Sequence, residues 1–225
     1  MEEIISYVFP PRNNHILSIL FGLLAKEIIG VNMFQEILYH VLKSLYQFTG
    51  AALLIAFLSM FFLLHIEKEG FKKSVGYLFK KLKEEKIFRS YFEFLFVLSM
   101  ILFRTVLCRN IWNNPLSNIV GNWGLYDGNG ALYTENIENT LLFIPLLYLY
   151  IRIKRQREEE CKILHSMLAA LSFSLLIEML QLFFKVGTFQ LSDLFFNTFG
   201  GLIGALIDKG VYNLIKKHNG YKTRE

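Results

Sequence analysis

The chain has 225 residues, of which 53% are hydrophobic and 19% charged, and its formal net charge is +5. Because the apolar residues lie in blocks between charged segments, the composition excludes an ordinary soluble domain and indicates one integral membrane domain. The start Met1-Glu2-Glu3 lacks the basic residues and the small-residue cleavage site of a signal peptide, so we expect no cleaved leader.

Residues 1–47 form an N-terminal segment with two predicted helices. Residues 16–30 are apolar but short, so they form either a membrane span or a re-entrant or interfacial helix. Residues 33–46 place apolar side chains at helical spacing with polar residues between them. This pattern predicts an amphipathic helix on the membrane surface.

Residues 48–225 form the main membrane domain, and their apolar blocks predict five spans. The spans lie near residues 48–65, 91–108, 138–153, 164–184 and 191–208. A further amphipathic helix is predicted within residues 71–82. The expected fold class is therefore all-α: a polytopic transmembrane helix bundle of five to six spans plus interfacial amphipathic helices. The sixth span would be residues 16–30.

The basic residues predict the orientation of these spans. They gather in residues 66–89, in residues 152–162 and in the tail after residue 208, which all fall on one side if the spans alternate. The loops at 108–137 and 185–190 carry little positive charge. By the positive-inside rule, we expect a multi-pass protein of the cytoplasmic membrane with a cytoplasmic C-terminus. Topology explains the basic residues, so we expect membrane lipids and no nucleic acid as partners.

The sequence lacks the patterns of a disulfide, of a metal site and of several enzyme classes. Cys108 and Cys161 fall on opposite sides of the predicted membrane, so no disulfide is expected. The five histidines are scattered without metal-ligand spacing, and the sequence holds no HExxH, Gly-x-Ser-x-Gly, CxxC or P-loop motif. We therefore expect no metal and no cofactor.

Seven polar residues fall in one layer near the outer ends of four predicted spans. They are Arg104, Glu138, Asn139, Glu178, Gln181, Asp193 and Asn197. In the last two spans the polar residues are three or four positions apart, so each pair projects from one side of its helix. A carboxylate in a span costs about 2.5–3.5 kcal/mol on insertion scales, so it needs a compensating partner. A guanidinium can hold two carboxylates, and we predict that Arg104 pairs with Glu178, Asp193 or both.

Most of these residues also have a purely structural explanation. Asp193 and Glu138 suit the positive end of a helix dipole in the first turn. Asn197 and Gln181 suit hydrogen bonds between helices. Glu178 lies about a turn and a half from the end of its span, where a short side chain does not reach water easily. We assign it a functional role or an essential ion pair.

Three short motifs, in this order, resemble those of the VanZ family of bacterial membrane proteins. Residues 136–145 read NIENTLLFIP, residues 177–181 read IEMLQ, and residues 193–204 read DLFFNTFGGLIG. The family pattern has an Asn before a Phe-x-Pro span, an Ile-Glu-x-x-Gln helix, and an Asp followed by Asn and small residues. The resemblance covers roughly residues 90–208. We interpret the small residues at 200–204 as a close-packing face rather than a ligand loop.

The sequence departs from the family pattern at the turn between the last two spans. Many members carry an Arg just after the Gly of this turn and an additional Asp before the main one. Here Thr188 and Gln190 occupy those places. The departure predicts that an outer-face cation–carboxylate pair is missing, with Arg104 as the residue that would compensate.

The resemblance implies a role in lowered susceptibility to teicoplanin-type glycopeptide antibiotics in Gram-positive bacteria. In one hypothesis, a polar cleft in the outer leaflet binds the head group of a lipid-linked cell-wall precursor, a lipoteichoic acid or the antibiotic. Trp112, Trp123 and Tyr126 would cap this cleft or lie at the membrane interface. In the alternative, the chain is an intramembrane enzyme that modifies an envelope lipid, with Glu178 as general acid or base and Asp193 as second carboxylate. The sequence leaves open whether the chain is an enzyme.

Overall fold

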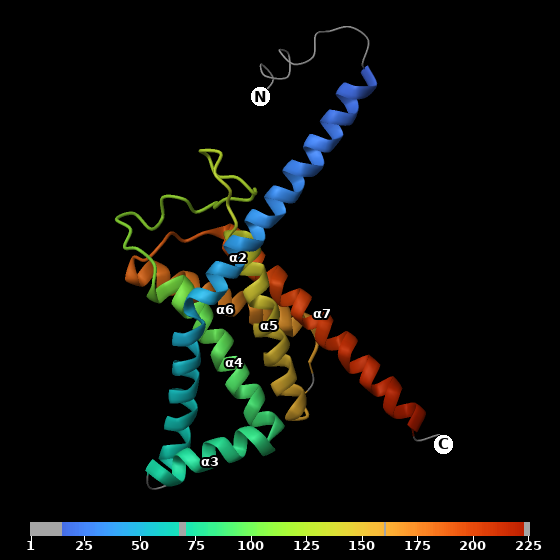
Figure 1. The fold of residues 1–225 in the computed structure, drawn as a ribbon. Helices are drawn as coiled ribbons and strands as arrows, with labels where there is room; N and C mark the ends of the chain where they lie inside the picture. The colour runs from blue at the N-terminus through green and yellow to red at the C-terminus, as the bar shows by residue number, and fades with distance from the viewer. Residues whose placement is uncertain (1–14, 68–70, 160, 223–225) are drawn as a thin grey trace. The chain divides into compact units, whose positions relative to one another are not determined.

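The computed structural model describes residues 15–67, 71–159 and 161–222 (Figure 1), and within them the regular secondary structure is all helical, without a β-strand. The helices are α2 (His15–Glu67), α3 (Phe71–Glu84), α4 (Lys86–Leu102), the π-helix η1 (Phe103–Leu107), α5 (Glu135–Gln156), α6 (Ile163–Phe184) and α7 (Leu191–Lys222). Four described segments are long and apolar enough to cross a membrane: Asn32–Leu64, Lys86–Leu107, Ile163–Phe184 and Leu191–Lys217. The expected helical membrane bundle is therefore confirmed.

α2 is one continuous helix where the sequence analysis separates three segments. Proline is absent between residues 15 and 67, so no residue interrupts the backbone hydrogen bonds of the helix. The chain divides into two compact units, Met1–His40 and Val41–Glu225, and α2 contributes to both. The side chains of residues 16–30 lie outside the described part of the structure, and the membrane span considered there stays a prediction.

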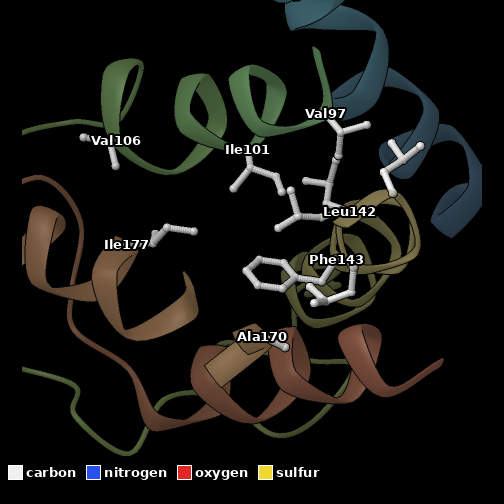
Figure 2. Packing of buried hydrophobic residues seen from close by; sticks show 10 residues of the cluster. Val97, Ile101, Val106, Leu142, Phe143, Ala170 and Ile177 are labelled. Carbon is white, nitrogen blue, oxygen red and sulfur yellow. The ribbon is translucent and has the colours of Figure 1, made fainter. Parts of the chain in front are cut away.

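α5 is the central helix of the second unit, because it packs against both α4 and α7 (Figure 1). Figure 2 shows the ring of Phe143 in α5 among Ile101 of α4 and Ala170 and Ile177 of α6. α5 coincides with the predicted span at 138–153 but is more polar than the four candidate spans. Its neighbours are helices rather than lipid, so it does not need an apolar outer surface.

α5 and α7 approach each other closely through glycine. A Cβ atom at Gly200 would overlap the carbonyl oxygen of Thr140, and one at Gly204 would overlap that of Ile144. A Cβ atom at Gly201 would overlap the side chain of Ala170 in α6. Small residues at this spacing let helix backbones come together, so the close-packing interpretation of residues 200–204 is confirmed.

α3 follows the predicted amphipathic pattern and packs its buried side on α2 and α4. Leu78 contacts a cluster that includes Met60 and Leu64 of α2. The guanidinium of Arg89 in α4 donates hydrogen bonds to the carbonyl oxygens of Leu82 at 3.2 Å and Lys83 at 2.8 Å. These bonds satisfy carbonyls at the end of α3 and fix the corner between the two helices.

Candidate functional site

Residues 108–134 and the turn between α6 and α7 lie together at one end of the bundle, here called the loop end (Figure 1). Four backbone hydrogen bonds join the two segments: Trp112 N to Lys185 O at 2.8 Å, Gly187 N to Asn110 O at 3.2 Å, Phe189 N to Pro115 O at 2.9 Å, and Leu191 N to Ile119 O at 2.8 Å. The loop is therefore held against the turn by regular backbone contacts.

The seven polar residues predicted from the sequence lie on the helix ends next to this loop. Arg104 belongs to η1, and two of the others lie in the first turns of α5. The remaining four lie near the end of α6 and the start of α7. Six of the seven are no more than 5% exposed, and the Arg104 side chain is 11% exposed. The structure thus buries this set of residues at one end of the bundle.

The ion pair of Arg104 differs from the expected one. Its guanidinium pairs with Glu138 of α5 and also donates to the hydroxyl oxygen of Ser44 in α2. The hydroxyl of Thr134 donates a hydrogen bond of 2.5 Å to the other oxygen of Glu138. The prediction that Arg104 pairs with Glu178, Asp193 or both was wrong, because α4, which continues into η1, packs on α5, and the guanidinium of Arg104 meets Glu138 at the start of that helix.

Glu178 is held by the backbone instead of by a cation. Its Oε2 accepts a hydrogen bond of 2.8 Å from the backbone N–H of Gln190, in the turn before α7. One turn further along α6, Gln181 donates a hydrogen bond of 2.9 Å to the carbonyl oxygen of Thr105 in η1. The π-helix therefore contributes a carbonyl to the site, in line with the frequent occurrence of such turns at functional sites.

Asp193 and Asn197 connect α7 to its two neighbours. The side-chain amide of Asn139 in α5 donates a hydrogen bond to the Asp193 carboxylate. Asn197 donates a hydrogen bond of 2.9 Å to the hydroxyl oxygen of Ser174 in α6. Together with the contacts of Arg104 and Gln181, these bonds form a polar network that joins η1, α5, α6 and α7.

This network contains more hydrogen-bond acceptors than donors. Among the described residues, the buried side-chain atoms without a partner at the loop end are Asn136 Oδ1, Gln181 Oε1, Asp193 Oδ1, Asn197 Oδ1 and Arg104 Nε. A buried polar atom without a partner costs about 1–3 kcal/mol, so four acceptors in one region are unusual. Their chemistry suits a group that donates hydrogen bonds, such as a hydroxyl or an ammonium.

A cavity of about 460 Å³ lies between the loop and the α6–α7 turn. Arg109 and Glu135 line it and form an ion pair of 3.2 Å, and the hydroxyl of Tyr133 donates a hydrogen bond of 2.8 Å to Glu135. The side chain of Gln190 also lines the cavity, while its backbone N–H holds Glu178. One residue thus connects the cavity to the buried carboxylate.

Arg109 and Tyr133 at this cavity keep one protonation state over the physiological pH range. Burial alone lowers the pKa of Arg109, but the negative charges of Glu135 and Asp193 outweigh it and raise that pKa. Burial, followed by the neighbouring charge of Glu135, raises the pKa of Tyr133 well above its ordinary value. Arg109 therefore stays cationic, and Tyr133 stays a protonated hydrogen-bond donor.

The sequence analysis missed the ion pair that lines this cavity. It expected no cation–carboxylate pair here because Thr188 and Gln190 replace the usual residues of the turn. The structure shows that Arg109 and Glu135 supply such a pair from other elements. A Cβ atom at Gly187 would lie 3.0 Å from Nη1 of Arg109, so the guanidinium packs directly on the glycine of the turn. The available signal was that Arg109 is the single basic residue of the loop at 108–137.

The three aromatic residues expected over the cleft take different positions. Trp112 lines the cavity. Trp123 packs against Phe195 and Phe196 of α7, with ring centroids 5.3 and 5.8 Å apart, and so fastens the loop to that helix. Tyr126 is exposed and outside the cavity lining. Within the described part of the chain, no group of three or more His, Cys, Asp or Glu residues is placed to hold a metal ion.

The fold and this site define an all-helical membrane protein with a buried carboxylate and amide network beside a loop-covered cavity. The family model described as VanZ/LLP1 matches residues 79–213, so the chain belongs to the VanZ/LLP1 family. The resemblance read from the three motifs is therefore confirmed, and the matched segment contains all seven predicted site residues. Comparisons with curated proteins and with solved structures gave no match.

Proposed function

We propose that this protein lies in the bacterial cytoplasmic membrane, binds a polar envelope ligand at the loop end, and thereby lowers susceptibility to teicoplanin-type glycopeptides. One observation carries the proposal: the cavity of about 460 Å³ is lined by the Arg109–Glu135 pair and reaches the buried network through Gln190. The family membership supports the link to glycopeptides.

The charge distribution supports an outward-facing loop end. Basic residues gather in α3, in the loop after α5 and at the end of α7, all away from residues 108–134. Positive charge marks the cytoplasmic side, so the loop end would face outward and the C-terminus inward. Glycopeptides and their wall targets are also outside the membrane, which agrees with this orientation.

The cavity suits a ligand that carries both anionic and hydroxyl groups. Arg109 can contribute a guanidinium to a phosphate or carboxylate, and its side chain is 18% exposed. The hydroxyl oxygen of Tyr133, whose proton is donated to Glu135, can accept a hydrogen bond, and the side chains of Thr188 and Gln190 offer both donors and acceptors. A lipid-linked cell-wall precursor, a lipoteichoic acid and the antibiotic itself all combine such groups.

The geometry favours binding over the enzymatic alternative. A general acid or base must come within about 2.6–3.2 Å of the atom whose proton it transfers. Glu178 is only 1% exposed, one of its oxygens is held by Gln190, and it is not part of the cavity lining. In this arrangement Glu178 shapes the floor beneath the cavity and does not reach a ligand there.

The experiment is a susceptibility test in a Gram-positive host that expresses the wild type or Arg109→Gln, with membrane protein levels matched. Arg152→Gln is the control, because Arg152 forms a comparable ion pair of 3.3 Å with Glu93 away from the loop end. We expect the wild type and the control variant to raise the inhibitory concentration of teicoplanin more than that of vancomycin. We expect Arg109→Gln to lose most of this protection.

Three other outcomes would oppose the proposal. No protection by the abundant wild type would remove the link to glycopeptides. Full protection by Arg109→Gln would remove the cavity from the mechanism. Complete loss with Glu178→Gln at normal protein levels, together with an altered envelope lipid in cells with the wild type, would favour the enzyme.

A further inference from the structure

A second cavity of the described structure lies near the C-terminal end of α5, whereas the loop-end cavity lies near its N-terminal end. Its volume is about 630 Å³, and its walls come from α2, α3, α4, α5, α6 and the residues after α5. The lining is mainly apolar and includes Leu64, Leu95 and Phe173. This cavity has no role in the function proposed above.

Three cations lie at this cavity, and each is positioned over an aromatic ring. The ammonium of Lys81 is 5.6 Å from the ring centre of Phe88, and that of Lys154 is 5.3 Å from the ring centre of Tyr150. The guanidinium of Arg157 is 5.4 Å from the ring centre of Tyr91. The rings support the side chains and orient the charges, since cations are attracted to aromatic faces.

Neighbouring carboxylates neutralise the charge of this group only in part. Glu159 is the one acidic residue of the lining, and it lies 3.5 Å from Lys154. Lys81 lies 3.8 Å from Glu85, but both pairs are partly exposed, and such pairs are worth only about 0–1 kcal/mol. Among the described residues, no carboxylate forms an ion pair with Arg157. The cavity therefore combines apolar walls with an excess of positive charge.

We propose that this cavity binds one anionic phospholipid of the leaflet on the basic side of the membrane. An acyl chain would lie along the apolar wall, and the phosphate of the head group would bind Arg157 and Lys81. Guanidinium and ammonium groups at helix ends are suited to phosphate, and basic pockets between membrane helices bind anionic lipids in this way. Lipid binding here would join α3 to the segment after α5.

The probe is an equal mixture of phosphatidylglycerol and phosphatidylcholine with the same acyl chains, added to the full chain in detergent. Native mass spectrometry measures which lipid stays bound, and thermal unfolding measures the stabilisation. We expect the protein to retain phosphatidylglycerol preferentially. The double variant Lys81→Gln/Arg157→Gln should weaken that binding about tenfold, the effect of losing roughly one charge-assisted hydrogen bond.

The matched control is Lys80→Gln/Lys209→Gln, which removes the same charge from positions outside this lining. We expect it to retain the lipid like the wild type. Equal loss in both double variants would show diffuse attraction to the basic surface and would overturn the site. Equal retention of the two lipids by the wild type would also overturn it. Stabilisation by inorganic phosphate as strong as that by the lipid would exclude the acyl chain from the site.

Discussion

Replacing Gly204 by Ala tests the packing of α5 on α7, on which the geometry of the site depends. The new Cβ atom would overlap the carbonyl oxygen of Ile144 and lie 3.1 Å from the backbone nitrogen of Tyr148. Both are backbone atoms of α5, so no side-chain rotation relieves the overlap. Overpacking of this kind costs about 1–3 kcal/mol. Either the two helices move apart, or the free energy of unfolding falls by that amount.

Gly210 provides the matched control, because it lies in the same helix and a Cβ atom there would have nothing within 4 Å. Replacing Gly by Ala in a helix gains about 0.8–1.0 kcal/mol from propensity alone. This gain is common to both variants, so the difference between them isolates the overlap at Gly204. We expect Gly210→Ala to be neutral or slightly stabilising and Gly204→Ala to be less stable than it by about 1–3 kcal/mol.

The assay is thermal unfolding of both purified variants in the same detergent, followed by circular dichroism. For a chain of this size, each kcal/mol corresponds to about 2–4 °C in Tm. The susceptibility test gives a second readout, because Asn139 and Asp193 bridge the same two helices near the loop end. If Gly204→Ala unfolds at the temperature of Gly210→Ala, the close contact between the α5 and α7 backbones is refuted.

Two further predictions concern the buried ion pair and the membrane topology. Arg104→Gln alone should lower the free energy of unfolding by about 3–5 kcal/mol, because it leaves Glu138 buried without its cation, and adding Glu138→Gln should restore much of that loss in thermal unfolding. An impermeant maleimide should label Cys108 but not Cys161 in intact cells that express single-cysteine variants. After permeabilisation Cys161 should react slowly at neutral pH and faster as the pH rises, because burial raises the pKa of its thiol and leaves less thiolate.

Each of these predictions has a clear contrary outcome. If Arg104→Gln and the double variant are equally stable, the two residues are not coupled in the folded protein. Labelling of Cys161 in intact cells would reverse the proposed orientation and place the loop end inside. Fast labelling of Cys161 that does not change with pH would contradict the burial of its thiol.

The helices were predictable because their signal is local. A membrane helix satisfies its own backbone hydrogen bonds, so an apolar block of the right length is sufficient to indicate it. The predicted spans at 164–184 and 91–108 correspond closely to α6 and to α4 with η1. The continuity of α2 was missed because the polar residues within 33–46 change the hydrophobic pattern without breaking the helix. Hydrophobic periodicity shows which face of a helix is apolar, but it does not show where that helix begins or ends.

The gathering of these polar residues at one end of the bundle was also predictable, but their pairing was not. Glu178 and Asp193 stood out because a carboxylate in an apolar helix is costly wherever its neighbours lie. Which cation meets which carboxylate depends on the order of helices around α5, and that order is a property of the packed bundle. Arg109 was missed for a similar reason, since only the path of the loop brings it onto Gly187.

The carboxylates at the loop end fall into two groups, those with an arginine as ion-pair partner and those without one. Two of its carboxylates, Glu135 and Glu138, have an arginine as ion-pair partner. Within the described residues, Glu178 and Asp193 have no such partner and are held by a backbone N–H and by a side-chain amide. A buried charge without a counter-ion costs more than an apolar side chain of the same size, so neither residue is explained by stability. These two positions therefore have the strongest claim to a role in shaping the polar network beneath the cavity, through Gln190 and Asn139.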